Sequence, residues 1–210
     1  MKKINLAIVG ATGAVGSEIF RVLEGIKIDN IENIYPFSSK RSANQEVEFN
    51  TKILKSIELE PNSFKKYNID VAIFSAGSSV SAKYVPYARD NGTIVIDNTS
   101  YFRMDKDIPL IVPEVNANEI ENYKTKNIIA NPNCSTIQML VAVAPLHKEF
   151  DIKRIVVATY QSVAGAGKDA MDELYNQTKA TLTHVNSNPE KFTKKIAFNV
   201  IPHIDVFMDD

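Results

Sequence analysis

The stretch INLAIVGATGAVG, residues 4–16, decides the fold. It begins with a nearly continuous apolar run, which is typical of a strand buried on both faces of a sheet. Glycines follow at positions 10, 13 and 16, and SEIFRVLEG (17–25) then has the apolar spacing of an amphipathic helix. A strand, a glycine turn and a helix in this order predict a parallel sheet covered by helices.

Short apolar runs and helical segments alternate over the first 132 residues. The expected strands are IENIYPF (31–37), IDVAIFSA (69–76), TIVID (93–97), LIVPEVN (110–116) and NIIAN (127–131). The expected helices are SAKYVPYARDNG (81–92) and ANEIENYK (117–124). This alternation predicts an α/β fold, a doubly wound Rossmann-type dinucleotide-binding domain over residues 1–132.

The pattern changes scale after residue 132. A long apolar helix is expected over 135–149, followed by a strand, RIVVATYQSV (154–163). A helix, DAMDELYNQTKATL (169–182), and a last strand, KIAFNVIPHI (195–204), complete the list. These elements indicate the beginning of a second, α+β domain over residues 133–210. The chain then stops at FMDD, so we expect this second domain to be incomplete.

The composition excludes several classes of protein. Charged residues make up 23% of the chain and the formal net charge is −1, which gives no reason to expect nucleic acid or an anionic membrane as partner. A single cysteine cannot form an internal disulfide, which indicates a reducing compartment. No window reaches the 18 or so apolar residues of a membrane span, and Asn5 interrupts the apolar run that imitates a signal peptide. We therefore expect a soluble, cytoplasmic protein without a metal site.

The glycine turn predicts a dinucleotide site. Its spacing is GxxGxxG and not the usual GxGxxG, yet glycines still permit close backbone approach and the helix N-terminus still offers N–H groups to a pyrophosphate. After the second strand comes SSKRS (38–42), with hydroxyls, two cations and no acid, which favours the 2′-phosphate of NADP over the ribose of NAD. The alternatives are a turn that only packs the helix on the strand, and a solvated basic loop.

The lone cysteine lies in NPNCST, residues 131–136, where the strand NIIA gives way to the apolar run IQMLVAVAPLHKEF. A thiol at a helix N-terminus experiences the positive end of the helix dipole, which favours the thiolate. The same N–H groups can stabilise an oxyanion formed from an attacked carbonyl. A lone cysteine is more often buried filler, but this position favours a nucleophile.

NPNCST, GATGAVG and NTSYFRMD (98–105) together resemble aspartate-β-semialdehyde dehydrogenase, and the resemblance continues through VPEVN and YQSVAGAGKDAMDEL along essentially the whole chain. It implies that NADPH reduces L-4-aspartyl phosphate to L-aspartate 4-semialdehyde with release of phosphate. This step serves diaminopimelate, lysine, threonine and methionine biosynthesis. The family also implies that residues 133–210 are part of a catalytic and dimerisation domain, through which two chains form a homodimer.

The resemblance assigns roles to individual residues. Cys134 would be the nucleophile that forms an acyl thioester, Gln161 would orient the substrate, and Arg103 would hold the transferred phosphate. Further substrate or phosphate contacts would come from Asn98, Ser100 and Asn133. The cofactor contacts would be Gly10, Thr12, Gly13, Ala14, Val15, Ser38, Ser39, Arg41, Ser42, Ser75, Gly77, Ala164 and Gly165.

The general base is the missing part. The family's base histidine and a second substrate arginine would lie beyond residue 210. His147 lies about 13 residues after Cys134, or roughly 20 Å along a helix, His184 is expected to face solvent, and His203 is a weak candidate. We therefore expect this chain alone to be inactive or nearly so.

Three alternatives remain open. N-acetyl-γ-glutamyl-phosphate reductase runs the same chemistry, but its cysteine lies in a GCYPT-like context. A non-catalytic NADP-binding module would explain the missing base. A short-chain-reductase-like protein, which relies on a Tyr-x-x-x-Lys pair, is the least favoured.

Overall fold

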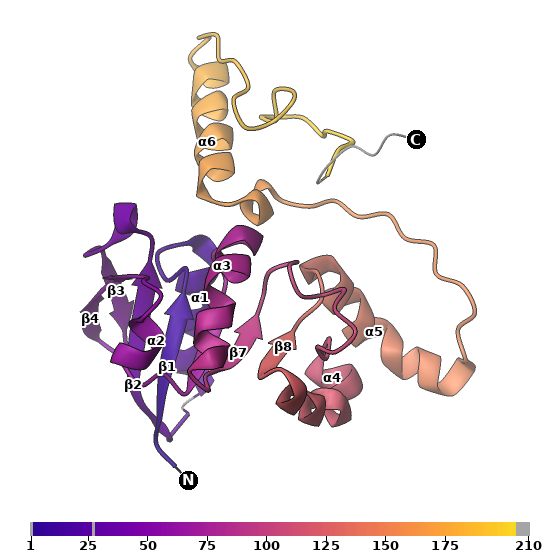
Figure 1. The fold of residues 1–210 in the computed structure, drawn as a ribbon. Coiled ribbons are helices and arrows are strands. Elements are labelled where there is room, and N and C mark those ends of the chain that lie inside the picture. Colours follow the sequence, from indigo (N-terminus) through magenta and orange to yellow (C-terminus); the bar gives the residue numbers. More distant parts are fainter. Residues whose placement is uncertain (1, 27, 205–210) are drawn as a thin grey trace. The chain divides into compact units, whose positions relative to one another are not determined.

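The chain divides into two compact units in the computed structural model, residues 1–158 and residues 159–210. The structure describes residues 2–26 and 28–204. The first unit contains a parallel sheet with its helices, and the second contains one long helix with its flanking segments (Figure 1). Each unit is described by itself below.

A parallel sheet forms the centre of the first unit. Six strands of the described residues run in the order β5-β2-β1-β6-β7-β8. They are β1 (Ile4–Val9), β2 (Ile31–Ser38), β5 (Ile57–Glu58), β6 (Val71–Phe74), β7 (Ile94–Asp97) and β8 (Ile128–Ala130). The chain moves outward from β1 to one edge and then returns to build the other half, which is the order of a doubly wound dinucleotide-binding sheet. The predicted fold class is confirmed.

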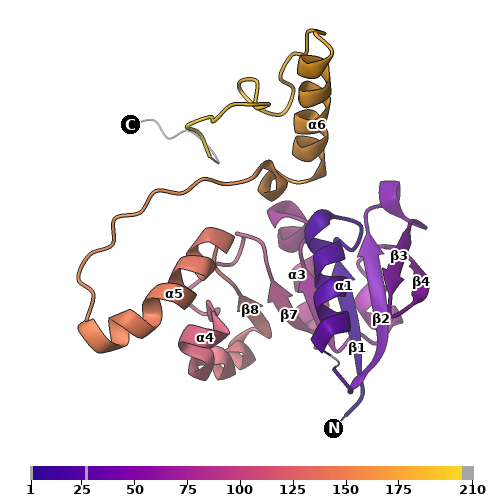
Figure 2. The ribbon, with the colours of Figure 1, turned by 180° about the vertical axis from the view of Figure 1, so that it is seen from behind.

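Both faces of this sheet are covered because its strands alternate between two cores. In β1, Ala7 and Val9 join one buried cluster while Leu6 and Ile8 join the other. Figures 1 and 2 show the consequence: α1 (Ala14–Ile26) covers one face and α3 (Ser78–Asp90) the opposite one. A short helix, α2 (Ser63–Lys66), contributes buried Phe64 to the core on the α3 side.

A small antiparallel hairpin, which the sequence interpretation missed, lies against α1. It consists of β3 (Glu46–Phe49) and β4 (Lys52–Lys55), joined by Asn50 and Thr51, both of which have positive φ. Phe49 packs edge-on against Phe20 of α1 with ring centroids 5.8 Å apart. The hairpin therefore extends the core on the α1 side beyond the main sheet.

The expected strand over 110–116 is wrong for most of its length. Only Leu110 forms a bridge, to Ala130, and the helix α4 (Pro113–Asn116) begins directly afterwards. Pro113 explains the change, because its fixed φ and missing N–H suit the first position of a helix. The helix expected at 117–124 is a run of 3-10 helix, η2 (Ala117–Thr125).

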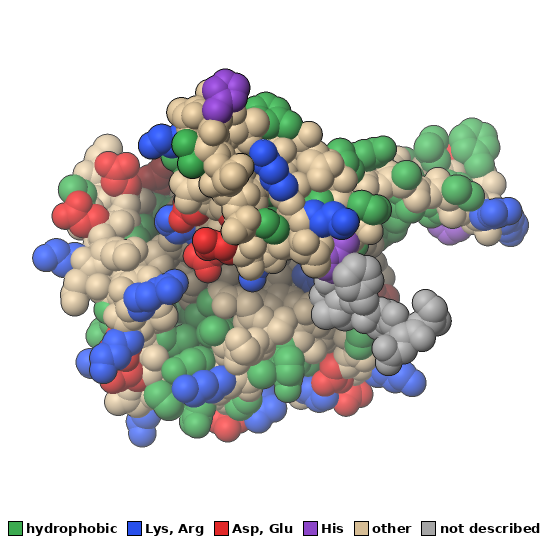
Figure 3. Space-filling view, turned by 90° about the horizontal axis from the view of Figure 1, so that it is seen from above, with side chains coloured by type: hydrophobic (Ala, Val, Ile, Leu, Met, Phe, Trp, Pro, Cys, Tyr) green, Lys and Arg blue, Asp and Glu red, His purple; other side chains and the backbone are tan. Residues whose placement is uncertain are grey.

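The long helix α5 (Cys134–Phe150) forms as expected, but none of its residues is buried. The strand predicted at 154–163 is wrong: residues 151–162 have no regular structure, and Val156 and Tyr160 are more than four fifths exposed. A strand needs a neighbour for its backbone hydrogen bonds, and within the described residues none pairs with this segment. Figure 3 shows the result as hydrophobic side chains on the surface of α5 and of the residues after it, at the right of the view.

The second unit consists of a 3-10 helix, η3 (Val163–Ala166), the helix α6 (Lys168–Leu182), and a loop that packs back on α6. Gln177 is fully buried and accepts hydrogen bonds from the backbone N–H groups of Ile196 and Ala197. The predicted strand 195–204 is wrong, because Phe198 adopts a left-handed φ of 57° that interrupts an extended run. No helix of the described residues is long and apolar enough to cross a membrane.

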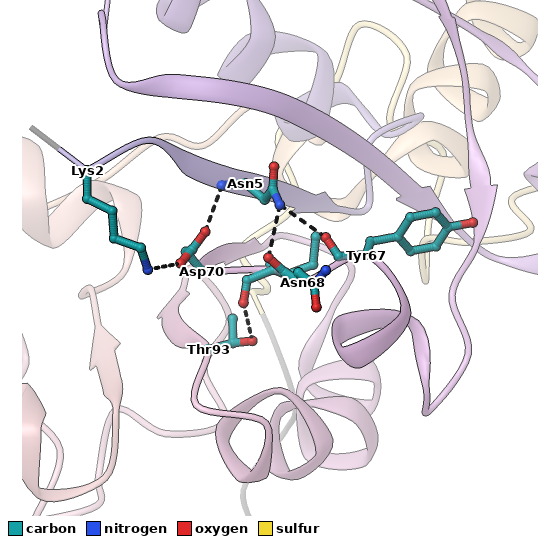
Figure 4. Close-up of polar contacts among 7 residues, drawn as sticks. Lys2, Asn5, Tyr67, Asn68, Asp70 and Thr93 are labelled. Atoms are coloured by element: carbon teal, nitrogen blue, oxygen red, sulfur yellow. Dashed lines mark hydrogen bonds and ion pairs between the residues drawn. The ribbon is translucent and has the colours of Figure 1, made fainter.

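The amino end of the sheet is fixed by one carboxyl group. Asp70 accepts hydrogen bonds from the backbone N–H of Asn5 at 2.9 Å and from the Lys2 ammonium at 2.8 Å (Figure 4). The Asn5 side chain donates to the carbonyls of Tyr67 and Asn68. These contacts connect β1 to the turn that leads into β6.

We expect Asp70→Ala to lower the free energy of unfolding by about 1–2 kcal/mol, because the amide of Asn5 loses its acceptor. Lys2→Ala is the matched control, and its loss should stay within about 0.5 kcal/mol because the Lys2 side chain is 82% exposed. Urea denaturation followed by circular dichroism measures both. Equal losses would show that the ion pair, and not the amide contact, fixes this edge.

The same contact predicts a dependence on pH. The hydrogen bond from Lys2, followed by that from Asn5, holds the pKa of Asp70 below its usual value of 3.8. A carboxyl group whose pKa is lowered in the folded state stabilises it above the unfolded-state pKa and loses that effect as the pH falls. The stability difference between wild type and Asp70→Ala should therefore shrink between pH 7 and pH 3.

Candidate active site

The glycine turn lies at the carboxyl edge of the sheet, where the strand order reverses between β1 and β6. The N–H groups of Gly10 and Ala11 both donate to the carbonyl of Phe37 at the end of β2, at 2.9 and 3.0 Å. Gly10 has a φ of 93°, and a Cβ there would lie 3.0 Å from the backbone of Ser75 and Ala76. The turn therefore touches the ends of three neighbouring strands, which is where doubly wound sheets bind ligands.

Helix α1 begins directly on this turn. A Cβ on Gly16 would lie 2.2 Å from the carbonyl oxygen of Gly10 and 2.8 Å from the Cα of Ala11, so only glycine fits at position 16. The first turn of α1 carries no acidic side chain. Its N–H groups, with the positive end of the helix dipole, can receive an anion such as a pyrophosphate. Of the predicted contacts, Thr12 and Gly13 lie in the turn, and Ala14 and Val15 are the first two residues of the helix.

The loops after β2 and β6 flank the turn. The buried Ser38 ends β2, and Ser39 and the 3-10 helix η1 (Lys40–Ser42) follow, with Arg41 exposed on η1. After β6, Ser75 donates through both its N–H and its hydroxyl to the carbonyl of Val9, at 2.9 and 3.0 Å. Gly77, with a φ of 96°, then begins α3. The structure thus brings the predicted cofactor residues of the first unit to one edge of the sheet.

Cys134 is the first residue of α5. Asn133 caps this helix: its side chain accepts from the backbone N–H of Ser135 at 3.0 Å, and its carbonyl accepts from Ile137 at 3.0 Å. The cysteine is exposed, and the preceding Pro132 is buried. The predicted helix N-terminus at the thiol is therefore present, with a well-formed cap.

Arg103 is tied to the backbone directly before the cysteine. Its Nε donates to the carbonyl of Asn131 at 2.9 Å, and its Nη2 donates to the carbonyl of Asn98 at 3.2 Å. The side chain of Asn131 donates to that of Asn98 at 2.8 Å. Asn98 and Asn131 follow the neighbouring strands β7 and β8. Arg103 is therefore held by a carbonyl that lies three residues before Cys134 in the sequence. The serine Ser100 of the same loop hydrogen-bonds Ser78 of α3 at 2.8 Å.

The sequence interpretation missed a buried polar group beneath this loop. Asp97, the last residue of β7, is fully buried and accepts hydrogen bonds from Ser81 and Thr99. The available signal was an acid that ends an otherwise apolar strand, TIVID, and is followed at once by polar residues.

The remaining predicted residues lie in or next to the second unit's short helix. Ser162 caps η3 by accepting from the backbone N–H of Ala164 at 3.2 Å, and Gln161, Ala164 and Gly165 are exposed. Among the described residues no cluster of three or more side chains is placed to bind a metal ion.

Two histidines and a tyrosine–lysine pair are further candidates for acid–base catalysis. His147 and His184 are exposed, the first on α5 and the second after α6. The sequence does contain a Tyr-x-x-x-Lys pair, Tyr175 and Lys179, on α6. Both side chains are exposed and belong to the second unit, whereas the glycine turn belongs to the first.

Two protein-family models match the chain. Residues 5–123 match the NAD binding domain of semialdehyde dehydrogenases, and residues 143–210 match their dimerisation domain. The first match contains the glycine turn, the loops after β2 and β6, and Arg103.

Individual relatives cover the whole chain. The aspartate-semialdehyde dehydrogenase of Campylobacter jejuni is 49% identical over 100% of this chain and 61% of its own length, and that of Rickettsia typhi is 50% identical with the same coverage. A solved structure of aspartate semialdehyde dehydrogenase II from Vibrio cholerae, complexed with ASA, has a TM-score of 0.92 and 45% identity, and it covers 100% of this chain and 61% of its own. The chain therefore spans 61% of the length of these relatives.

We expect Gly16→Ala to weaken dinucleotide binding by about a hundredfold or more and to lower the melting temperature, because the new methyl group would overlap the carbonyl of Gly10. Gly25→Ala is the matched control in the same helix, since nothing lies within 4 Å of its Cβ. It should leave binding unchanged and stabilise the helix by up to about 1 kcal/mol. Titration with NADPH and thermal denaturation measure both effects. Normal binding by Gly16→Ala would refute the close approach.

Proposed function

The chain belongs to the aspartate-semialdehyde dehydrogenase family, and from this premise we propose that it supplies the cofactor site and the nucleophile for reduction of L-4-aspartyl phosphate to L-aspartate 4-semialdehyde. The observation that carries the proposal is the position of Cys134 at the capped start of α5, three residues after the carbonyl that holds Arg103. An acyl phosphate needs both groups: a nucleophile for its carbonyl carbon and a cation for its phosphate.

The chemistry begins at the sulfur of Cys134. The thiolate attacks the acyl carbon, an S–C bond forms, and the C–O bond to phosphate breaks as inorganic phosphate leaves. N–H groups at the first turn of α5 are available to the oxyanion of the tetrahedral intermediate. A nicotinamide dinucleotide bound at the glycine turn would supply the hydride that reduces the resulting thioester. Cys134 would then leave as the thiolate when the C–S bond breaks and the aldehyde is released.

Arg103 is proposed to hold the phosphate during this exchange. A planar guanidinium suits a dianionic phosphate because it can donate two parallel hydrogen bonds. Its bonds to the carbonyls of Asn98 and Asn131 fix the plane of the group before substrate arrives. Asn98, Ser100 and Asn133 are proposed to line the same pocket.

The proposed cofactor is NADP. A nicotinamide dinucleotide is supported by the match of residues 5–123 to an NAD binding domain and by the glycine turn, in which a Cβ on Gly10 or Gly16 would lie too close to neighbouring backbone. The choice of NADP rests on Ser38, the last residue of β2, and on Ser39, Arg41 and Ser42 directly after it, with no acid among them. An exposed guanidinium and neighbouring hydroxyls would contact the 2′-phosphate.

Three residues of the second unit are also proposed to take part in the reaction. Gln161 would orient the substrate, and Ala164 and Gly165 would contact the nicotinamide. The match of residues 143–210 to a dimerisation domain supports a homodimer. We also propose a domain boundary at 132/133 and a cytoplasmic location. The proposed reaction would serve the synthesis of lysine, threonine and methionine.

We propose that the 210-residue chain alone does not turn over. The reaction needs a general base, and His147, the histidine that shares the helix of Cys134, lies about 20 Å along it. Acylation of the cysteine requires only the thiolate and the phosphate contact, so this half of the reaction should remain.

Arg41→Ala should weaken NADPH binding by about 10- to 100-fold and NADH binding by less than about threefold, because only NADPH carries the 2′-phosphate. Arg89→Ala is the control, since it removes the same charge at the far end of α3. Fluorescence titration of the wild type and of both variants with NADPH and NADH measures the six affinities. Equal loss of both cofactors in Arg41→Ala would refute the NADP assignment.

Intact-mass spectrometry should detect a thioester adduct when the chain is mixed with L-4-aspartyl phosphate generated in place by an aspartate kinase and ATP. Cys134→Ser should give no adduct, and Arg103→Ala should form it at least about tenfold more slowly. N-acetyl-γ-glutamyl phosphate serves as the substrate control and should react poorly.

Steady-state reduction of NADP⁺ by L-aspartate semialdehyde and phosphate should be absent from the same preparation. Absence of the adduct from a folded, NADPH-binding chain would contradict the nucleophile assignment. Turnover by the wild type would contradict the missing base and would direct attention to His203.

A further inference from the structure

Asp97 is the centre of a buried polar network that the proposed reaction does not use directly. Its Oδ1 accepts from the hydroxyl of Ser81 at 2.7 Å and from the backbone N–H of Thr99 at 3.2 Å. Its Oδ2 accepts from the hydroxyl of Thr99 at 2.9 Å. Ser81 and Asp97 are fully buried and Thr99 is 7% exposed. Every polar atom of this network therefore depends on the others for its partners.

The network determines the path of the chain between β7 and Arg103. Asp97 bends the backbone at Asn98 by accepting from Thr99, two residues further on. Thr99 extends the turn, because its hydroxyl oxygen accepts from the backbone N–H of Tyr101 at 3.3 Å. Ser81 anchors the turn to α3 on the face of the sheet.

Both carbonyls that hold Arg103 lie next to this turn. Asn98, whose carbonyl accepts from Nη2 of Arg103, is the residue enclosed between Asp97 and Thr99. Asn131, whose carbonyl accepts from Nε, donates its backbone N–H to the carbonyl of Asp97 at 3.3 Å. A change at Asp97 would therefore alter the direction of both acceptors.

We propose that Asp97 is a positioning residue, which acts through Thr99 and Asn98 to hold the Arg103 guanidinium in the orientation that receives phosphate. The phosphate role of Arg103 rests on the proposed function, whereas the orientation of its side chain does not. Asp97 is buried beneath the loop and has no contact with substrate in this assignment.

An apolar side chain at position 97 would continue the core of β7 without any desolvation cost. A buried carboxyl group is expensive unless its oxygens are hydrogen-bonded, and here three bonds satisfy it. The arrangement thus favours one conformation of the loop rather than the greatest stability, as expected for a device that positions a binding group.

Four variants separate positioning from stability. Asp97→Ala removes all three acceptor contacts, and Thr99→Val removes one hydroxyl at nearly constant volume and remains informative if Asp97→Ala fails to fold. Asp97→Asn is the conservative rescue, because its amide can still accept from Ser81 and the Thr99 N–H and can donate to the Thr99 oxygen. Asp70→Asn is the matched control, an Asp→Asn change at the opposite end of the sheet, where Asp70 also accepts a backbone N–H.

The first measurement is the hydrogen-exchange rate of the Arg103 Nε–H by nitrogen-15 NMR, with the signal assigned by its loss in Arg103→Lys. Asp97→Ala and Thr99→Val should exchange at least about tenfold faster than wild type. Asp97→Asn should stay within about threefold of wild type, and Asp70→Asn should match it. Unchanged exchange in both disruptive variants, or equal acceleration in Asp70→Asn, would overturn the positioning role.

The second measurement is the affinity of the NADPH-saturated chain for inorganic phosphate by calorimetry. Asp97→Ala or Thr99→Val should weaken phosphate binding by about tenfold while NADPH affinity changes less than about twofold. Arg103→Ala is the control for the phosphate site. If this variant binds phosphate as tightly as the wild type, the proposed phosphate role of Arg103 is wrong, and the exchange measurement alone decides the role of Asp97. If phosphate binding does depend on Arg103 but is unchanged in Asp97→Ala and Thr99→Val, the positioning role of Asp97 is also overturned.

Discussion

The contact between Gly16 and the carbonyl oxygen of Gly10 is the constraint on which the rest of the first unit depends. A side chain at position 16 would have to occupy space 2.2 Å from that oxygen, so α1 can begin on the turn only because the residue is glycine. The close approach aims the N-terminus of α1 along the carboxyl edge of the sheet. It also lets the turn rest on the ends of β2 and β6, through Phe37 and Ser75. A positive helix end is thereby presented where the strand order reverses.

The same edge collects the polar groups that carry chemistry. Parallel strands end together, so loops that are far apart in sequence become neighbours without any long-range design. Asn98 after β7 and Asn131 after β8 show this directly, because their side chains bond each other and their carbonyls share one arginine. The guanidinium is oriented by backbone, which is more rigid than side chains. The buried Asp97 extends that rigidity one layer deeper into the sheet.

Local sequence patterns were enough to predict much of the fold and of the site. The predictions that were wrong or missing depend on partners far away in the sequence. β1, the glycine turn and the start of α5 at Cys134 follow from residues adjacent in sequence. The run 154–163 has the composition of a strand, but strand composition reports a fit to a pleated surface and does not supply the neighbouring strand. Phe198 breaks the run 195–204 through a backbone angle that its residue type rarely adopts. Asp97 was missed because its partner Ser81 lies on another element, 16 residues away. Arg103 was assigned by resemblance, and only the structure shows which carbonyls fix it.

The exposed apolar surface of α5 and of the residues after it favours aggregation of the isolated chain. No residue of α5 is buried. In the drawn-out segment that follows it (Figure 1), Val156 is 82% exposed and Val157 is 62% exposed. Extended backbone beside β-branched side chains is the feature by which separate molecules add strands to one another and aggregate. We therefore expect the solubility of the isolated chain to be limited by this region.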